Sequence, residues 1–578
     1  VLFRSTEEQA NSSFDDYWAN FDYTRTGNSA IVAREDNAPW FSEYVRRELA
    51  SMVYGEDDIY SSGFTVNTTL NLKNQIAAQN AMEYYIAYAN RSYQRGNNMR
   101  QNEAFRIYTP LTELLTLTFN LGSLKVSQQR NEALALSTYT KTINPIVDVM
   151  SLVCGIDSLK VGVANKANAV AKLNVGKNVI EGTMIALENS TGYITSLVGG
   201  SKFDGENQFI RAVQAKLQPG SSFKPLYYSA AIDSRQYTPS TIISDTPVVF
   251  HTADGKPYIP QNFRGEWKGD VELWYALAHS MNVPSLKILD GIGFDTAINR
   301  AIDLLGVPKE EIPNRGFVPG YPIGLGVCSV RPIEVAHAYA IFANGGKEVV
   351  PIAIRSVEDK NGNVFLNPER EVRQKQQAKG ASTQIISPQT AYVMARLLEN
   401  TVKTGTLAGP TGNGSKFTYR NENGRKYTIP AAGKTGTTQN WADAWAACFT
   451  PYYTSVFWFG FDKPGQSLGL ELTGSTLAGY AMASFMQKAH EGLPYKNFTR
   501  PSSGTVDVTV CSVSGDLPAD DCEGHKITLT FLEGTQPTEL CTLHSGNSAG
   551  RLLGIYRLEQ DLYRAGFASD PIIKDTSP

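Results

Sequence analysis

The segment Gln218–Pro225, which reads QPGSSFKP, decides how this chain is to be interpreted. It contains Ser221 followed three residues later by Lys224, the only Ser-x-x-Lys of the sequence. Two further motifs follow in order, SMN at Ser280–Asn282 and KTG at Lys434–Gly436. Each motif alone is a common coincidence in a long chain, whereas the ordered set, each member in a suitable local setting, indicates one shared site.

The first motif has the composition of an activated nucleophile. Ser221 precedes a helix-like run, Phe223–Asp233, and the positive end of a helix dipole favours an alkoxide. Lys224 lies one turn later, so we expect its amine to reach the Ser221 hydroxyl. A lysine whose pKa is lowered by a neighbouring cation such as Lys434 can act as general base. Taken alone, the pair is better explained by a capping serine and a solvated lysine.

The second motif lies at a predicted helix end, before Val283-Pro284. Ser280 is in a position to relay a proton between Lys224 and a leaving amine, and Asn282 to bind a substrate amide. The alternative is that both are ordinary polar residues at a helix terminus, where they are favoured for their hydrogen bonds.

The third motif falls within a strand pattern. Glycines in a strand allow a ligand to approach the backbone, and we expect Gly436 to have this role on an exposed edge strand that binds an extended peptide. The hydroxyls of Thr435 and Thr437, with Lys434, are candidates to bind a terminal carboxylate. The backbone N–H groups of Thr437 and Ser221 are candidates for an oxyanion hole. The alternative is a glycine-rich surface turn.

The composition is that of a globular protein of two to four units. Hydrophobic residues make up 42% of the 578 residues and charged residues 19%, with a formal net charge of -3. This charge gives no basic surface for nucleic acid, and no segment approaches the roughly 18 apolar residues of a membrane span. Among the six histidines no pair has metal-ligand spacing.

Strand patterns on both sides of a helical block predict an α/β fold of the α+β type, with an antiparallel sheet, over 181–490. The predicted elements are a hairpin over 184–200, helices over 270–280, 295–306, 332–345, 388–405 and 477–490, and strands over 431–449 and 454–461. Two polar segments, 359–386 and 406–428, are interpreted as surface excursions. A separate tail is predicted to contain strands over 505–510 and 527–531. Before them, 43–49 reads as a helix and 64–70 as a strand followed by a helix.

The tail holds three of the six cysteines, Cys511, Cys522 and Cys541, with His544 close behind. We expect one disulfide among them in an oxidising compartment. Free thiols are the second possibility. A zinc site formed by these three cysteines and His544 is the least favoured, because the set lacks a short Cys-x-x-Cys pair.

At these motifs the chain resembles the transpeptidase half of class A (bifunctional) penicillin-binding proteins. QPGSSFKP resembles their nucleophile segment nearly residue for residue, and Asn262-Phe263 with 271–284 resembles their second-motif helix. Further similar segments are 324–326, 332–346 and, more loosely, 511–515. The similarity covers about 38–90 and 181–490. Cys328 departs from it, standing where a small polar residue is expected.

The resemblance implies a penicillin-binding-protein/serine β-lactamase-like fold and a D,D-transpeptidase of peptidoglycan synthesis. Ser221, Lys224, Ser280 and Lys434 would be catalytic, with Asn282, Thr435, Gly436 and Thr437 binding substrate. The partners would be stem peptides, β-lactams and other cell-wall synthesis proteins, and no metal or organic cofactor is needed. A serine β-lactamase and a non-catalytic β-lactam sensor remain alternatives.

The resemblance also implies an enzyme at the outer face of the bacterial cytoplasmic membrane. The chain opens on Val1–Ser5, which looks like vector sequence, so we expect a glycosyltransferase half and an N-terminal membrane anchor to be missing. The predicted division is 1–48 as residual linker, 49–180 as linker or inserted module, 181–490 as transpeptidase domain and 491–578 as C-terminal extension.

Overall fold

The structure is a computed structural model that describes residues 36–53, 63–105, 179–205, 207–252, 254–262, 265–469 and 471–544, without the side chains of 96–105. Of the linker or inserted module predicted over 49–180, residues 54–62 and 106–178 lie outside these residues, as do the predicted vector sequence and Cys154.

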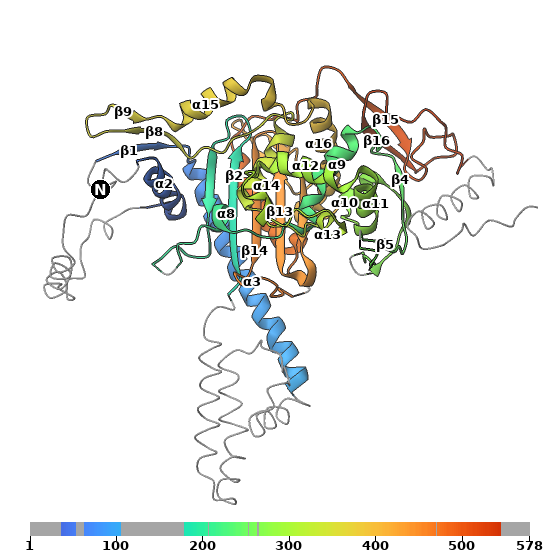
Figure 1. Ribbon diagram of the computed structural model, residues 1–578, viewed down its shortest axis with the longest axis horizontal. Coiled ribbons are helices and arrows are strands. Elements are labelled where there is room, and N and C mark those ends of the chain that lie inside the picture. The colour runs from blue at the N-terminus through green and yellow to red at the C-terminus, as the bar shows by residue number, and fades with distance from the viewer. Residues whose placement is uncertain are drawn as a thin grey trace, which may run out of the picture.

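A five-stranded sheet forms the centre of the molecule (Figure 1). Its strands, in spatial order, are β12 (Ala432–Thr437), β13 (Asp443–Phe449), β14 (Tyr453–Gly460), β2 (Glu181–Glu188) and β3 (Ile194–Val198). All four pairings are antiparallel, which confirms the predicted antiparallel sheet. The strand that carries the KTG motif, β12, is an edge strand of this sheet.

The helices lie mainly between the sheet strands in sequence. They are α2 (Pro39–Met52), α3 (Leu72–Phe105), α8 (Arg211–Gln214), α9 (Lys224–Asp233), α10 (Leu273–Ala278), α11 (Asn282–Ile292), α12 (Phe294–Leu305), α13 (Tyr321–Gly324), α14 (Pro332–Ala343), α15 (Pro368–Lys379), α16 (Pro388–Lys403), α17 (Ala408–Thr411) and α18 (Gly479–His490). Short helical turns are η2 (Gly220–Phe223), η4 (Ile312–Asn314), η5 (Gly380–Thr383), η6 (Gln439–Trp441) and the π-turn η7 (Gly474–Ala478).

The remaining strands form small sheets around this body. They are β1 (Thr65–Thr68) with β8 (Ile354–Glu358) and β9 (Val364–Leu366), β4 (Ile242–Asp245) with β7 (Gly269–Glu272), β5 (Phe250–His251) with β6 (Pro257–Tyr258), β10 (Thr418–Arg420) with β11 (Lys426–Thr428), and β15 (Thr505–Cys511) with β16 (Lys526–Leu532). The last pair is the predicted tail hairpin, which lies at one end of the molecule in Figure 1.

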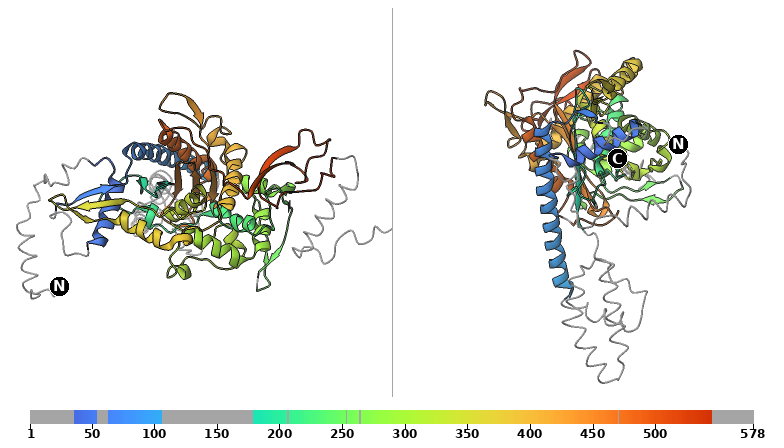
Figure 2. Two further views of the ribbon diagram at one scale, coloured as in Figure 1. Left: turned by 90° about the horizontal axis from the view of Figure 1, so that it is seen from above. Right: turned by 90° about the vertical axis from the view of Figure 1, so that its left-hand side faces the viewer.

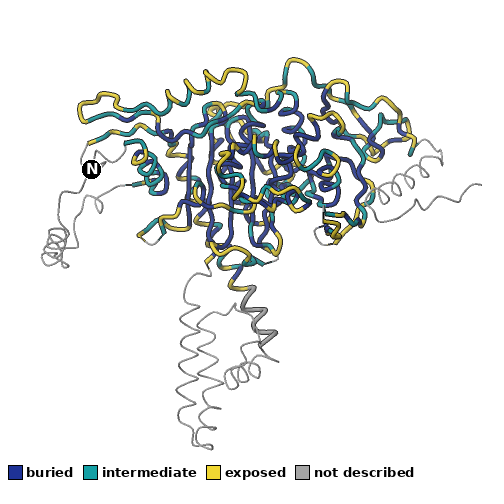
Figure 3. Tube along the Cα trace, viewed as in Figure 1, coloured by how far each residue is buried: buried dark blue, intermediate teal, exposed yellow. Residues whose placement is uncertain are grey.

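Helices cover both faces of the central sheet. On one face, rings of α14 contact Phe449 of β13, whose cross-strand partner is Thr454. On the other face, Phe485 of α18 contacts Phe457, three residues beyond Thr454 on β14 and therefore on the opposite side. Since both faces are covered, β13 and β14 are buried along almost their whole length instead of on alternate residues (Figure 3).

Helix α3 packs against α18 and against β2 and β3. Its C-terminal half projects away from the body in two perpendicular views (Figures 1 and 2).

Several helices begin or end at the proline and glycine residues where the sequence predicted it. Pro332 and Pro388 each open a helix, and Gly306 ends α12 in the left-handed conformation, with φ of 65°. These predictions are confirmed.

Two predicted boundaries are wrong. The helix predicted over 270–280 starts later, because 269–272 pairs with β4 as strand β7 and α10 starts only at Leu273. The polar segment 359–386 lies at the surface, as predicted, and contains the exposed helix α15, which was not predicted because it has no buried apolar face. The strand predicted over 431–449 is broken after Thr437 by η6, where Asn440 and Trp441 have positive φ.

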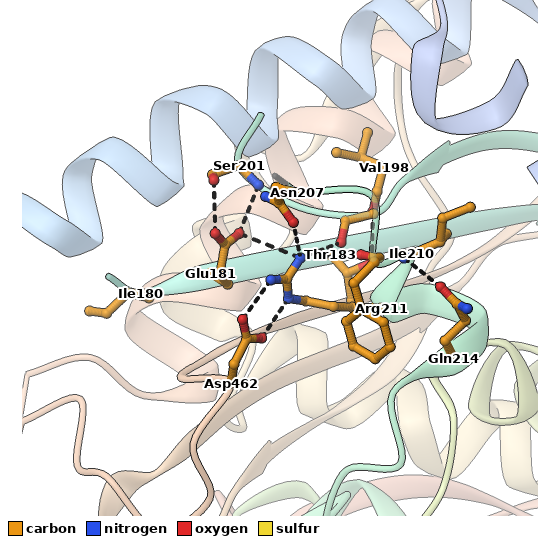
Figure 4. Close-up of polar contacts among 12 residues, drawn as sticks. Ile180, Glu181, Thr183, Val198, Ser201, Asn207, Ile210, Arg211, Gln214 and Asp462 are labelled. Atoms are coloured by element: carbon orange, nitrogen blue, oxygen red, sulfur yellow. Dashed lines mark hydrogen bonds and ion pairs between the residues drawn. The ribbon is translucent and has the colours of Figure 1, made fainter. Parts of the chain in front are cut away.

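A buried arginine holds together the segment that leads into QPGSSFKP. Arg211, 3% exposed at its side chain, donates through Nε and Nη2 to the two carboxylate oxygens of Asp462, each at 2.7 Å. Its Nη1 donates to the Gly199 carbonyl at 3.1 Å and lies 3.8 Å from the Glu181 carboxylate. Figure 4 shows the guanidinium between the two carboxylates, with Ser201 donating to Glu181. Arg211 therefore fixes α8 to β2 and to the chain beyond β14.

We predict that Arg211→Met destabilises the protein by about 1–3 kcal/mol, because Glu181 loses its cation in a buried setting. The urea midpoint of unfolding measures the change. Lys202→Met is the matched control, since the ion pair of Lys202 with Asp204 is exposed and should contribute less than about 1 kcal/mol. Equal midpoints for both variants would contradict this role of Arg211.

Candidate active site

The Ser-x-x-Lys motif forms a tight turn at the start of α9. Ser221 lies in η2 and Lys224 is the first residue of α9. The neighbouring Ser222 is buried, and its hydroxyl donates back to the Pro219 carbonyl at 2.7 Å. Only the Ser221 side chain is left partly accessible and without a hydrogen bond to any described residue. The turn therefore presents one of its two serines.

Two side chains from elsewhere in the fold hold this nucleophile turn in place. The Tyr339 hydroxyl of α14 donates to the Ser222 carbonyl at 2.8 Å, and Trp445 Nε1 of β13 donates to the Gln218 carbonyl at 2.7 Å. Both rings are completely buried. The turn is thus fixed to the sheet and to the helix that covers it.

Because Gly220 and Gly436 have no side chain, the nucleophile turn can lie directly on the KTG strand. A Cβ added at Gly436 would come within 2.3 Å of the Pro219 carbonyl oxygen, and one added at Gly220 within 2.9 Å of the Thr437 oxygen. Gly220 also has φ of 55°, which favours glycine. The main chains of the first and third motifs are therefore in contact.

The amine of Lys224 is completely buried and faces the second motif. Its Nζ donates to the Ser280 carbonyl, the Met281 carbonyl and Asn282 Oδ1, each at 2.9 Å. This differs from the expected contact with the Ser221 hydroxyl, which the structure does not record. Three acceptors match the three donors of an ammonium, so loss of one proton would release one contact and expose a lone pair.

The second lysine reaches Ser280 from the opposite side. Lys434 Nζ, also completely buried, donates to Ser280 Oγ at 2.7 Å and to the Thr435 carbonyl at 2.9 Å. Ser280 lies between α10 and α11 with φ of 60°, a left-handed conformation that is rare for serine. In this conformation its carbonyl accepts from Lys224 and its hydroxyl from Lys434. Ser280 thus bridges the two amines.

Burial changes the protonation of both lysines. The pKa of Lys224 is well below its usual value, first because the amine is buried and second because Lys434 lies close to it. Burial lowers the pKa of Lys434 to about 7. A neutral amine is therefore accessible near neutral pH, which is what general base catalysis by a lysine requires.

The Asn282 side chain forms hydrogen bonds inside the site. Its Oδ1 accepts from Lys224, and its Nδ2 donates to the Gln261 carbonyl at 2.9 Å. Asn262 in turn accepts from the Asn282 and Val283 N–H groups at 3.0 and 3.3 Å, and donates to Asp245 at 2.6 Å. Sequence analysis missed this role of Asn262, because its contacts join segments about twenty residues apart.

The KTG threonines have different surroundings. Thr435 Oγ1 donates to Thr406 Oγ1 at 2.7 Å, and Thr437 Oγ1 accepts from the Gly474 N–H at 3.1 Å. Sequence analysis missed Thr406 and Gly474, since nothing in their local sequence points to the site. The KTG strand is at a sheet edge, as predicted, but Lys434 and Gly436 are buried rather than exposed.

Two cysteine predictions have definite outcomes among the described residues. The expected disulfide is absent, since Cys511, Cys522 and Cys541 are all free thiols. Cys328, the departure from the family pattern, is buried, and burial raises its pKa, so that its thiol is inert.

Comparison with known proteins identifies this arrangement. Residues 182–463 match the family described as penicillin binding protein transpeptidase domain, and 501–546 match the penicillin-binding protein 1A C-terminal domain. The chain belongs to the class A penicillin-binding proteins and carries their transpeptidase half. The resemblance found in the sequence is thereby confirmed.

Individual relatives agree with this membership. Penicillin-binding protein 1A of Neisseria gonorrhoeae is 30% identical over 492 residues, which is 81% of this chain and 57% of the relative. The chain thus spans little more than half of that relative's length.

Two solved structures show the same fold as this penicillin-binding protein. That of penicillin-binding protein 1A from Haemophilus influenzae has a TM-score of 0.62 at 21% identity, covering 87% of this chain and 77% of the other. That of PonA1 from Mycobacterium tuberculosis in complex with penicillin V has a TM-score of 0.52 at 20% identity, covering 80% and 96%. They confirm the predicted fold class.

Within the part of the chain that the structure describes, no helix is both long enough and apolar enough to cross a membrane.

The backbone of Ser280 yields a stability prediction. Ser280→Gly and Ser280→Ala both remove the hydroxyl, but only glycine relieves the left-handed conformation, so the Gly variant should be more stable by about 1 kcal/mol. Thermal or urea unfolding measures the difference. Ser285, inside α11, is the matched control, because there glycine should be the less stable variant by about 1 kcal/mol. The same order at both positions would contradict strain at Ser280.

Burial of Lys434 yields a pH prediction. Its folded pKa of about 7 lies below the value in the unfolded chain, so between these values the unfolded state binds more protons. Stability should rise with pH above about 7, by at most about 1.4 kcal/mol per pH unit for one proton. Lys434→Met should be more stable than the wild type at low pH and should show a weaker rise. Parallel pH profiles of unfolding for the two proteins would contradict the lowered pKa.

Proposed function

We propose that this chain is a peptidoglycan D,D-transpeptidase that crosslinks stem peptides through a Ser221 acyl-enzyme. The observation that carries the proposal is the placement of Ser280 between two buried amines, next to a turn that presents Ser221. The membership in the class A penicillin-binding proteins supports it.

The proposed acylation step uses the two lysines in different roles. Neutral Lys224 takes the proton of Ser221 as Oγ attacks the carbonyl carbon of the D-Ala-D-Ala peptide bond. The oxyanion accepts hydrogen bonds from the backbone N–H groups of Ser221 and Thr437, and each such donor is typically worth about 10²–10³ in rate. As the C–N bond breaks, Ser280 passes a proton to the leaving amine of D-Ala and regains one from its lysine partners.

In deacylation the same residues act in reverse. The amine of a neighbouring stem peptide attacks the ester carbonyl and loses its proton through Ser280 to Lys224, and Ser221 leaves with a proton. The new amide bond is the crosslink. No further cofactor enters the balance of this step.

Substrate binding is proposed at the KTG strand. Protonated Lys434, with the hydroxyls of Thr435 and Thr437, attracts the terminal carboxylate of the stem peptide or the carboxylate of a β-lactam. Gly436 lets the peptide lie close to the strand. Asn282 is proposed as the residue that holds Lys224 and presents an amide hydrogen near the substrate, since its oxygen already accepts from Lys224.

The proposed setting follows from this substrate. Peptidoglycan is assembled outside the cytoplasm, so the site would work at the outer face of the bacterial cytoplasmic membrane, with cell-wall synthesis proteins as partners. The division into 1–48, 49–180, 181–490 and 491–578 stays a proposal, supported by family matches that begin at 182 and 501.

The nucleophile gives the direct test. Ser221→Ala should abolish covalent labelling by a fluorescent penicillin. Ser222→Ala is the matched control, because its hydroxyl only caps the turn, and losing about 1 kcal/mol slows acylation less than about tenfold. Labelling that survives in Ser221→Ala and disappears in Ser222→Ala would overturn the assignment.

Stopped-flow acylation and deacylation with the same penicillin separates the alternatives. A transpeptidase keeps the adduct for long and also releases D-Ala from a D-Ala-D-Ala peptide. Rapid turnover of the adduct would identify a β-lactamase, and a stable adduct without peptide chemistry would identify a sensor.

A further inference from the structure

The described part of the C-terminal tail, from β15 to His544, has no separate apolar cluster apart from its three cysteines. These residues form the hairpin β15–β16 and two irregular loops, 512–525 and 533–544. A lone two-stranded hairpin is marginal in water, and units of this size usually depend on disulfides or a metal ion. Apolar residues of the hairpin pack on the transpeptidase domain, whereas the loops converge on a separate cluster of three buried cysteines.

Four side chains of this cluster point their ligand atoms at one small space. The sulfur atoms of Cys511, Cys522 and Cys541 lie 3.4, 3.2 and 3.4 Å from His544 Nδ1, and all four atoms lie within 4.8 Å of one another. In a tetrahedral zinc site with Zn–S of about 2.3 Å and Zn–N of about 2.0–2.1 Å, sulfur and nitrogen are about 3.6 Å apart. The three observed sulfur–nitrogen distances are within a few tenths of an ångström of this value.

Hydrogen bonding alone does not account for this cluster. One ring nitrogen offers either a single lone pair or a single N–H, so Nδ1 cannot bond to three thiols at once. A disulfide between any two cysteines would leave the third thiol and the imidazole unexplained. A cation at the centre satisfies all four groups together.

The backbone around the cluster is ordered in a way that holds these ligands. Cys511 ends β15, and its N–H and C=O bond to Asp516 and Gly515 at 2.8 and 2.9 Å. Cys541 donates through its N–H to the Leu517 carbonyl at 2.7 Å, joining the final loop to the first. The ring of His525 stacks on His544 at 4.9 Å between centroids, with 8° between their planes. Cys522 donates through its N–H to the Ala519 carbonyl at 3.1 Å, so each of the four side chains is positioned by contacts outside the cluster.

We propose that Cys511, Cys522, Cys541 and His544 bind one structural Zn²⁺ ion. Three thiolates and one imidazole form a closed tetrahedral set, which is typical of structural rather than catalytic zinc, and the buried sulfur ligands favour zinc over magnesium or calcium. Cys541 and His544 form a short ligand pair. The four residues were considered as a zinc set from the sequence and disfavoured for lack of a Cys-x-x-Cys pair, but Cys541 and His544 supply a short pair of another kind.

The proposed zinc site orders a turn that touches the transpeptidase domain. A Cβ on Gly515 would lie 2.2 Å from the Ser240 carbonyl oxygen, so the turn after Cys511 rests on that segment. The adjacent carbonyls of Pro239 and Thr241 accept from the N–H groups of Trp274 and Leu273 at the start of α10. The zinc thus fastens the tail to the segment that starts the helix before Ser280.

Metal content of the purified full chain, prepared with a thiol reductant, tests this proposal. We expect one zinc per chain, and cobalt substitution should give the thiolate charge-transfer and intense visible bands of a tetrahedral site. Cys522→Ser and His544→Ala should lose the metal, and His544→Cys should restore it. His525→Phe is the matched control, because it keeps the stacked ring but removes an imidazole that is not a ligand.

Thiol alkylation of the wild type keeps the test valid if a variant does not fold. The three tail cysteines should resist alkylation until a chelator removes the zinc, while buried Cys328 and Cys448 stay protected throughout. Absence of stoichiometric metal, retention of zinc in both Cys522→Ser and His544→Ala, or a disulfide between two tail cysteines would overturn the proposal. Penicillin labelling at Ser221 is measured separately, so the zinc proposal and the transpeptidase proposal can each fail without the other.

Discussion

Two lysine amines buried within reach of one serine are the constraint on which the rest of this structure depends. Lys224 and Lys434 are completely buried, and both contact Ser280. Removing an amine from water costs free energy unless it loses its proton or gains partners. The molecule uses both routes, since the pKa values are lowered and backbone carbonyls, Asn282 and Ser280 accept the hydrogen bonds. Under the proposed function, this cost in stability provides a neutral amine that can act as a base.

The fold brings these amines together from two separate layers. Lys434 belongs to the edge strand of the sheet, whereas Lys224 starts the helix that follows the nucleophile turn. Ser280 comes from the junction of α10 and α11, and its left-handed backbone turns the carbonyl to one lysine and the hydroxyl to the other. Tyr339 and Trp445 hold the turn from the helical and the sheet side. The site therefore exists only where sheet and helical block meet.

The sequence predicts those features that depend on neighbouring residues. It correctly predicted the order of the three motifs, the helix starts at proline, the helix end at Gly306 and the antiparallel strands. Contacts between distant segments were not, because the direction in which Lys224 points, the support from Asn262 and the left-handed Ser280 are decided by tertiary packing. Helix α15 was not predicted because it has no buried apolar face. The four proposed zinc ligands of the tail were each recognised in the sequence, but only the folded tail shows that their side chains lie together.

The contact of Gly436 with the Pro219 carbonyl has a consequence for how such a site can evolve. Here main chain meets main chain, so no rotamer change can adjust the gap between the nucleophile turn and the KTG strand. For the proposed acyl transfer, this means that side-chain substitutions around the site can change which acyl donor binds, yet they leave the separation of these two backbones as it is. Under that proposal, substrate selectivity and reactivity depend on different parts of the protein, and a change in one need not disturb the other.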